Sequence, residues 1–265
     1  MQSKWYNSSG QPLSSSEWLR DHHKAKLLDR KEFIKRICKD YNPKRIIDLG
    51  CATGLWLDLF DEFAPKNCEF IGIDTDKNSI AEAEKKSKSW NRKSQFIVCD
   101  IVNETDKIPE GDLFLAFNMF SYITNAKVFL ETIQSKMSIN SKLVIRQYDG
   151  NTIRFGPMKS KDRLSMDNSL YSAIGTSQQF HHYDLDRVYS IINHSSFNNK
   201  NIAFETFQRS APFHNDFIDY FQGTIEWYTY YLSEYDAEKL QKWYKLSKEQ
   251  TNTYFLEVDL TAILS

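Results

Sequence analysis

One stretch near residue 50 constrains the fold more than any other, because a buried strand there runs into a glycine loop. The strand pattern over 44–49 is rich in β-branched residues and carries Asp48 near its end. The loop from Gly50 to Gly54 then opens a helical pattern over 55–63. Glycine permits positive φ and lets a ligand lie against bare main chain. Such a loop at the carboxyl edge of an α/β sheet is where nucleotides bind.

The loop does not fit the dinucleotide-binding fingerprint G-x-G-x-x-G. Its second and third glycines would fall where Ala52 and Leu55 stand. Those glycines allow close approach of the pyrophosphate and tight packing of the helix on the strand. The sequence therefore argues against a dinucleotide as the ligand.

Strand and helix patterns alternate from residue 44 onward. Strands are expected at about 45–49, 69–73, 95–99, 112–117, 142–148, 202–208 and 254–263. Helices are expected at about 18–39, 54–63, 77–89, 125–137 and 184–194, with a long loop at 149–179. Near-continuous apolar strands separated by helices indicate an α/β fold with a parallel sheet covered on both faces.

Polar residues stand at the ends of the strands that follow the glycine loop. Asp74 ends the second strand, and an acid at this place can accept hydrogen bonds from both ribose hydroxyls of a nucleotide. Asp76 is predicted to cap the helix that follows. The third strand runs into Asp100, and the fourth runs into Asn118. The carboxyl ends of four strands therefore carry side chains suited to one ligand.

The segment Asp48-Leu-Gly50-Cys51-Ala52-Thr-Gly54 resembles the first motif of class I S-adenosylmethionine-dependent methyltransferases, acid-x-Gly-x-Gly-x-Gly, with Ala52 in place of the middle glycine. The later strand ends follow in the family's order. The resemblance implies a Rossmann-like seven-stranded mixed sheet with helices on both faces, and S-adenosyl-L-methionine as cofactor. It implies that the glycine loop holds the methionine part, Asp74 the ribose and Asp100 the adenine. The implied cofactor-binding residues are Asp48, Gly50, Cys51, Ala52, Gly54, Asp74, Thr75, Asp100, Ile101, Asn118, Met119 and Phe120.

The reaction that the resemblance implies is in-line displacement at the sulfonium methyl group, for which the protein aligns the reactants and excludes water. A general base is needed only if the acceptor must lose a proton. Tyr148 and Asp149 are candidates because they end the fifth strand, and His181 and His182 because they precede the late helix. A structural role is the alternative for each of the four.

The chain divides by composition into three parts. Residues 1–42 form a helical cap at the N-terminus, residues 43–209 and 251–265 form the cofactor-binding core, and residues 210–250 form an aromatic-rich insertion before the last strand. Eleven aromatic residues in the insertion favour either a lid with an aromatic acceptor pocket or an aromatic core or dimer face. His22 and His23, adjacent in the N-terminal helix, are expected to play a surface or capping role.

Charge and cysteine content exclude several classes of protein. The net charge of −1 gives no global field that would attract nucleic acid or an anionic membrane, although residues 1–45 carry eleven Lys/Arg against five Asp/Glu. The cysteines, Cys38, Cys51, Cys68 and Cys99, show no metal-ligand spacing and are expected to be small buried hydrophobes in a reducing compartment. No apolar leader or membrane span is visible, which favours a cytoplasmic protein without a metal site.

Three functions remain open on the sequence alone. Near-neutral charge and the aromatic insertion favour methylation of a small-molecule acceptor at oxygen, nitrogen or carbon. The basic N-terminal region supports methylation of RNA or protein, but residues 118–121 read Asn-Met-Phe-Ser and lack an Asn-Pro-Pro-Tyr-type amine motif. The third is a non-methylating use of the cofactor, such as cyclisation, which no sequence feature excludes. Oligomeric state is open, and a homodimer is one expectation.

Overall fold

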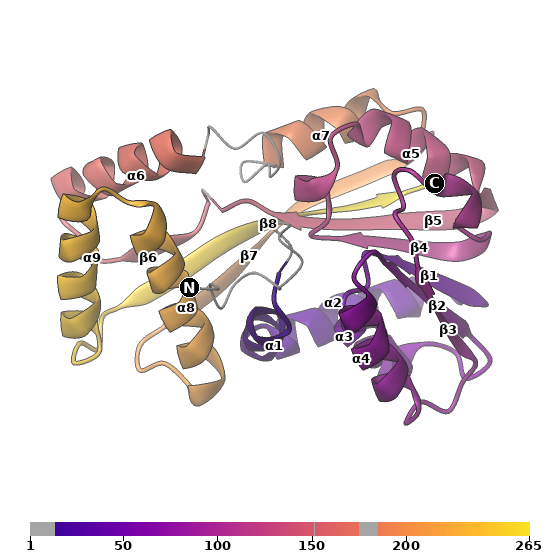
Figure 1. Ribbon diagram of the computed structural model, residues 1–265, viewed down its shortest axis with the longest axis horizontal. Helices are drawn as coiled ribbons and strands as arrows, with labels where there is room; N and C mark the ends of the chain where they lie inside the picture. The colour runs from indigo at the N-terminus through magenta and orange to yellow at the C-terminus, as the bar shows by residue number, and fades with distance from the viewer. Residues whose placement is uncertain (1–13, 151, 175–184) are drawn as a thin grey trace. The chain divides into compact units, whose positions relative to one another are not determined.

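A computed structural model describes residues 14–150, 152–174 and 185–265 (Figure 1). The strands are β1 (Arg45–Leu49), β2 (Glu69–Asp74), β3 (Ser94–Val98), β4 (Gly111–Phe117), β5 (Met137–Tyr148), β6 (Arg154–Gly156), β7 (Lys200–Ser210) and β8 (Tyr254–Leu264). The helices are α1 (Ser16–Ala25), α2 (Leu27–Asp40), α3 (Leu55–Phe63), α4 (Lys77–Ser87), α5 (Ala126–Ser135), α6 (Ser160–Ile174), α7 (Leu185–His194), α8 (Asn215–Tyr231) and α9 (Glu234–Ser247). Short 3₁₀ turns lie at η1 (Thr105–Lys107) and η2 (Phe120–Tyr122).

The strands form one mixed sheet in the order β3-β2-β1-β4-β5-β8-β6, with β7 also paired to β8. The neighbours β3, β2, β1, β4 and β5 are parallel, whereas β6 and β8 are antiparallel. The predicted α/β Rossmann-like fold is therefore confirmed. All seven predicted strands are present, and the short β6 adds an eighth.

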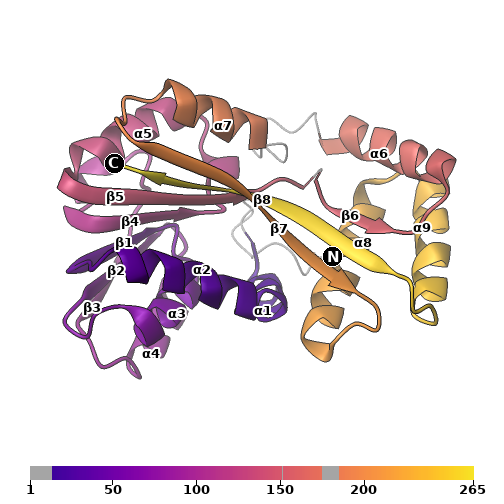
Figure 2. The same ribbon diagram turned by 180° about the vertical axis from the view of Figure 1, so that it is seen from behind.

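The chain folds into two compact units, each described by itself. Unit 2 comprises residues 27–147, 185–204 and 260–265, and contains β1–β4 and most of β5. The strand order reverses at β1, so right-handed crossovers send α3 and α4 to one face and α5 to the other. Figures 1 and 2 show α5 and α7 on the face opposite α2, α3 and α4. These helices bury the apolar strands on both sides, as the sequence pattern predicts.

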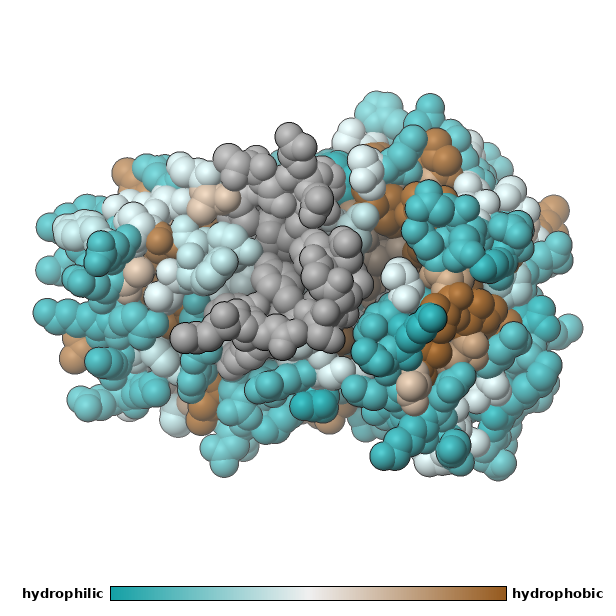
Figure 3. Space-filling model, viewed as in Figure 1, coloured by the Kyte–Doolittle hydropathy of each residue, from teal (hydrophilic) through white to brown (hydrophobic). Residues whose placement is uncertain are grey.

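Unit 1 comprises residues 1–26, 148–184 and 205–259. Its core is aromatic, and the rings of Phe155, Phe217, Tyr220, Phe221 and Phe255 are almost completely buried. Many of these rings meet edge to face, the arrangement that their quadrupoles favour. Polar side chains dominate the visible surface of α6 and α9 in this unit (Figure 3). Most of the aromatic residues of α8 thus serve as core within the described part of this unit.

The structure overturns two expectations about secondary structure. The expected loop at 149–179 is wrong, because β6 and the helix α6 occupy much of it. The sequence did not predict the helix α6 because, among its described residues, only Met166 and Leu170 are fully buried apolar residues. Two such residues are too few to form a helical pattern. The expected single helix at 18–39 is divided into α1 and α2 at Lys26, which no glycine or proline marks.

The prediction for His22 is wrong, whereas the burial predicted for the cysteines is largely confirmed. His22 is 5% exposed and stacks on Tyr220 with ring centroids 5.0 Å apart, so the expected surface or capping role is wrong. The burial expected for the cysteines is confirmed for Cys51, Cys68 and Cys99, whereas Cys38 is half-buried. Among the described residues, no group of His, Cys, Asp or Glu is placed to hold a metal ion, and no helix is long and apolar enough to cross a membrane.

Candidate cofactor site

The carboxyl ends of the central parallel strands lie level with one another in unit 2. Leu49 at the end of β1 is paired with Ile73 of β2 and with Ala116 of β4, and Asp74 is paired with Val98 of β3. The strand order reverses at β1, and ligands of open α/β sheets bind in the crevice at such a switch point. The register therefore brings the predicted cofactor-binding residues to one edge of one sheet.

The glycine loop is held tightly against the end of β2. The amides of Gly50 and Cys51 both donate to the carbonyl oxygen of Ile73, at 2.8 and 2.9 Å, and the Gly54 amide donates to the carbonyl of Cys51 at 2.9 Å. Gly50 and Gly54 have φ of +72°, and Ala52 has φ of +45°. The departure from the family motif at Ala52 thus places a side chain in the left-handed region that favours glycine.

Gly54 is required both for its backbone conformation and for its lack of a side chain. A Cβ atom on Gly54 would lie 3.1 Å from the Cβ of Ala83 in α4, closer than most such contacts. Gly50 is less crowded, because its Cβ would lie 3.6 Å from the Cβ of Met119. The same distance shows that Met119, at the end of β4, packs beside the glycine loop.

Asp74 links the glycine loop to the turn after β2. Its Oδ2 accepts the Ala52 amide at 2.8 Å, and its Oδ1 accepts the Asp76 amide at 2.9 Å. Burial raises the pKa of Asp74, and the hydrogen bonds from Asp76 and Ala52 counteract part of that rise. Thr75 beside it is exposed. Asp76 caps α4, as predicted.

Asp48 is the most deeply buried acid at this edge. Its side chain is 1% exposed, and its Oδ2 has no hydrogen-bond partner among the described residues. Burial raises the pKa of Asp48 well above its ordinary value, and the nearby Asp74 raises it further. Strongly perturbed carboxyl groups that gather in one place are characteristic of functional sites.

Asp100 organises the turn after β3. Its Oδ1 accepts the amides of Val102 and Asn103, and its Oδ2 accepts the Asn103 side-chain amide at 2.7 Å. Partial burial alone would raise the pKa of Asp100, but these three hydrogen bonds together hold it below its ordinary value. A carboxylate has about four acceptor positions, so Oδ2 retains capacity for a ligand. Ile101 is 8% exposed.

The end of β4 turns sharply at Asn118, which has φ of +53° and donates its amide to the Arg146 carbonyl of β5 at 2.7 Å. The Phe120 ring is fully buried against Phe129 of α5. The ring of Phe120 therefore lies in the core beneath the turn. The positive φ of Asn118 gave no signal in the sequence beyond the tolerance of asparagine for this region.

Two of the candidate catalytic residues, Tyr148 and Asp149, belong to a different unit from the cofactor-binding residues. Tyr148 lies in unit 1, where its ring meets His22 edge to face at 5.7 Å and the Lys26 ammonium lies 5.9 Å from the ring centroid. Asp149, in the same unit, is 7% exposed. His181 and His182 lie outside the described residues.

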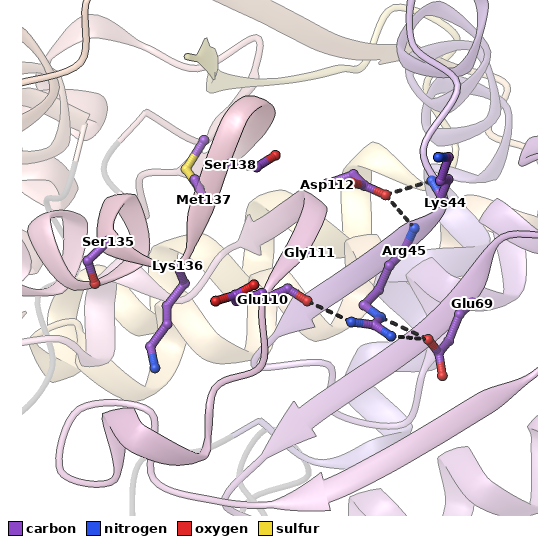
Figure 4. Close-up of a pocket in the computed structure, with 10 residues that line it drawn as sticks. All are labelled: Lys44, Arg45, Glu69, Glu110, Gly111, Asp112, Ser135, Lys136, Met137 and Ser138. Atoms are coloured by element: carbon purple, nitrogen blue, oxygen red, sulfur yellow. Dashed lines mark hydrogen bonds and ion pairs between the residues drawn. The ribbon is translucent and has the colours of Figure 1, made fainter.

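A separate hollow of about 450 Å³ lies at the amino ends of β1 and β4, away from the candidate site (Figure 4). Three of its charged side chains, Arg45, Glu69 and Asp112, bind other groups of the same hollow. Arg45 pairs with Glu69 at 2.7 Å, and the carboxylate of Asp112 accepts the amides of Lys44 and Arg45.

A glycine loop and buried carboxylates at the switch point of a parallel sheet define a protein that binds a nucleoside-containing ligand. A family model described as a methyltransferase domain matches residues 42–209. The chain belongs to this family, the class I S-adenosylmethionine-dependent methyltransferases that its motifs resemble.

Known proteins are similar to this chain over parts of their length. It is 31% identical to an uncharacterized protein of Haemophilus influenzae over 39% of this chain and 42% of that protein. It is 26% identical to the ubiquinone biosynthesis O-methyltransferase of Bradyrhizobium diazoefficiens, over 40% of this chain and 41% of that protein. It is 27% identical to the carboxy-S-adenosyl-L-methionine synthase of Helicobacter pylori, over 43% of this chain and 48% of that protein. The chain spans less than half the length of these relatives.

Solved structures support the fold. The YcgJ protein of Bacillus subtilis superposes with a TM-score of 0.52 at 10% identity, over 90% of this chain and 98% of that chain. Coclaurine N-methyltransferase, bound to N-methylheliamine and S-adenosylhomocysteine, superposes with a TM-score of 0.51 at 11% identity, over 99% and 76%. At such identities the likeness concerns the fold alone.

Proposed function

We propose that the chain transfers the methyl group of S-adenosylmethionine to an oxygen, nitrogen or carbon atom of a small-molecule acceptor. The observation that carries the proposal is the pair of acids beside the glycine loop, of which Asp48 is buried and Asp74 is half-buried. Neither forms an ion pair within the described residues. A ligand that brings ribose hydroxyls and positive charge to this edge satisfies both acids.

The residues at the strand ends divide the cofactor among them. The loop from Gly50 to Gly54 offers main-chain groups to the methionine part, and Asp74 accepts the ribose hydroxyls. The free acceptor position on Asp100 and the amide of Ile101 suit the adenine ring. Val98 and Val102 flank Asp100 with side chains 40% and 43% exposed, which gives the flat faces of the base apolar surfaces to cover.

The bound cofactor supplies an activated methyl group, and the protein supplies alignment and exclusion of water. The acceptor's lone pair forms a bond to the methyl carbon as the carbon–sulfur bond breaks, and the electron pair of that bond stays on sulfur. If the acceptor is a hydroxyl or an ammonium group, a base removes its proton. Tyr148, Asp149, His181 and His182 remain our candidates for this base, and 210–250 our candidate lid.

A small-molecule acceptor is favoured by the net charge of −1 and by the similarity to a ubiquinone O-methyltransferase. The similarity to a carboxy-S-adenosylmethionine synthase favours a second candidate, in which the chain modifies the cofactor without transferring its methyl group. Mass spectrometry separates the two, because incubation of the protein with cofactor and candidate acceptors yields either a methylated acceptor or a modified sulfonium compound.

Calorimetry with S-adenosylmethionine, S-adenosylhomocysteine and NAD tests cofactor binding. We expect both adenosyl compounds to bind and NAD not to bind. Asp74→Asn should weaken binding by roughly 10–100-fold, because a charge-assisted pair of hydrogen bonds to ribose is lost. Asp112→Asn, which alters an acid at the amino end of β4, is the matched control and should change the Kd less than about twofold. Binding of NAD alone, or equal effects of both substitutions, would contradict the proposal.

A further inference from the structure

The turn that follows β4 is held by hydrogen bonds from two residues, Gln147 and Arg187, that belong to no sequence motif. Gln147 of β5 holds it through main-chain and side-chain hydrogen bonds, and Arg187 of α7 holds it through two carbonyl groups. The turn spans Asn118, Met119 and η2, the segment that would border the reacting sulfonium. All of these residues belong to unit 2.

The side chain of Gln147 is 1% exposed and uses both ends of its amide. Its Oε1 accepts the Phe120 amide at 3.2 Å, and its Nε2 donates to the Ser121 hydroxyl at 3.2 Å. A main-chain amide can only donate, so the oxygen of Gln147 must face Phe120. Buried polar groups are costly unless they are hydrogen-bonded, and therefore this glutamine is tied to the turn.

Strand alternation explains why Gln147 reaches the turn. Arg146 stacks on Phe33 of α2, with its guanidinium carbon 4.8 Å from the ring centroid. Successive side chains of a strand point to opposite faces of the sheet, so Gln147 projects toward the face that η2 and α5 cover. Substituting a neighbour of Gln147 on β5 therefore alters a different contact.

Arg187 donates hydrogen bonds to two main-chain carbonyl groups of the turn. One guanidinium nitrogen donates to the Ile123 carbonyl at 3.0 Å, and a second donates to the Phe120 carbonyl. The planar fork of arginine can span two carbonyl groups, whereas a lysine ammonium acts as a single charge at one point. Gln147 and Arg187 together hold the amide and the carbonyl of the same residue, Phe120.

The fastened turn meets the glycine loop, because the Met119 Cβ lies 3.6 Å from the position of a Cβ on Gly50. A shift of the turn therefore displaces one wall of the site. We infer that Gln147 and Arg187 are positioning residues that fix the β4 turn and so shape the part of the site that takes the amino-acid portion of the cofactor. This inference rests on the proposed function.

The strand order separates this effect from binding of the nucleoside. The turn follows β4, whereas Asp74 and Asp100 follow β2 and β3, on the other side of β1. Loosening the turn should weaken a ligand that carries the amino-acid portion and spare one that ends at the thioether. S-adenosylhomocysteine and 5′-methylthioadenosine form such a pair of probes.

The test measures the Kd of both probes by calorimetry for Gln147→Met and Arg187→Lys. Methionine keeps the length and buried volume of glutamine without its hydrogen bonds, and lysine keeps the charge of arginine without its fork. We expect the Kd of S-adenosylhomocysteine to rise roughly tenfold and that of 5′-methylthioadenosine to change less than about twofold. Arg187→Lys supplies the test if Gln147→Met does not fold.

Two matched controls separate positioning from general loss of stability. Ser141→Ala removes a buried hydroxyl of β5 that donates to the Gly111 carbonyl at 2.8 Å, at the far end of the strand. Arg92→Lys alters an arginine that donates to the carbonyls of Asp61 and Pro65. Both should lower the free energy of unfolding and leave the ratio of the two Kd values unchanged.

Each other outcome has a definite meaning. Equal weakening of both probes, no weakening of either, or a changed ratio in the controls overturns the positioning role. A wild-type protein that binds neither probe overturns the proposed function instead, which keeps the two failures distinct.

Discussion

The two units bury carboxylates in opposite ways. In unit 1, Glu257 and Asp259 are almost completely buried and face the ammonium of Lys26, which pairs with Glu257 and lies 3.9 Å from Asp259. The Tyr220 hydroxyl donates to Glu257 at 2.6 Å. In unit 2, Asp48 and Asp74 form no ion pair with any described residue. Unit 1 supplies a countercharge for Glu257 and Asp259, whereas the described part of unit 2 supplies none for Asp48 and Asp74.

This difference distinguishes acids that contribute to the stability of the fold from acids that are available to bind a ligand. A buried ion pair with further hydrogen bonds is a closed arrangement that contributes to packing and specificity. Asp48, which is buried, and Asp74, which is half-buried, have no countercharge and hold raised pKa values, and a cationic ligand relieves that cost. Substitutions of the same kind should therefore affect stability in unit 1 and ligand binding in unit 2.

The largest effect should come from breaking the closed arrangement in unit 1. Lys26→Met leaves two buried carboxylates without their ammonium group, which should lower the free energy of unfolding by about 3–5 kcal/mol. Urea denaturation of the purified protein measures the loss. The affinity for S-adenosylhomocysteine should change less than about threefold, because the strand ends that carry the proposed cofactor-binding residues belong to unit 2.

Lys24→Met is the matched control for this change. Lys24 is two residues earlier in the chain and pairs with Asp219 at 3.4 Å, but both side chains are more than half exposed. Water screens such a pair, so its loss should cost less than about 1 kcal/mol. Similar losses for the two lysine variants would show that the buried network in unit 1 has no special importance.

A smaller effect should come from the glycine loop of unit 2. Gly54→Ala places a Cβ at φ of +72° and 3.1 Å from Ala83, and should lower the free energy of unfolding by about 2 kcal/mol. Ala52→Gly relieves the same kind of strain at φ of +45° and should raise it by about 0.5 kcal/mol, since glycine also makes the unfolded chain more flexible. Urea denaturation checks both signs, and a gain from Gly54→Ala would refute the role given to this loop.

The sequence predicted unit 2 better than unit 1 for a physical reason. The strands β1–β4 are short, apolar and separated by helices whose apolar residues repeat at helical spacing, so local pattern and final burial agree. Residues 27–147 alone supply most of unit 2, whereas three shorter stretches of chain assemble unit 1, whose core depends on contacts between them. His22 is buried against Tyr220, a residue far from it in sequence, and no residue near His22 indicates this contact.

The same limit applies within the candidate site. Asp74 and the glycine loop could be recognised because their spacing from the strands is local. The roles of Gln147 and Arg187 could not, because their partners in the β4 turn lie 26 to 67 residues away. Motif reasoning finds the groups that face a ligand, and the structure adds the groups that hold them in place.

The sharpest probe of the contrast between the units is the pH dependence of stability that Asp48 causes. Burial and Asp74 raise the pKa of Asp48 in the folded protein above the unfolded value of about 3.9. The folded state therefore binds the proton more tightly, so the favourable contribution of this carboxyl is complete below about pH 4 and is lost as pH rises through the folded pKa. Asp48→Asn removes this titration.

We expect the free energy of unfolding of Asp48→Asn, relative to wild type without ligand, to rise by about 1 kcal/mol between pH 4.5 and pH 7. Glu69→Gln is the control of opposite sign. Hydrogen bonds from Lys93 and Arg45 lower the pKa of Glu69, so the stability it contributes is present at neutral pH and lost only as pH falls below about 4.5. Urea denaturation carried from neutral pH to below pH 4.5 measures both. If the difference between Asp48→Asn and wild type is the same at every pH, the pKa of Asp48 is not raised in the free protein, and the contrast between the two units fails at its central residue.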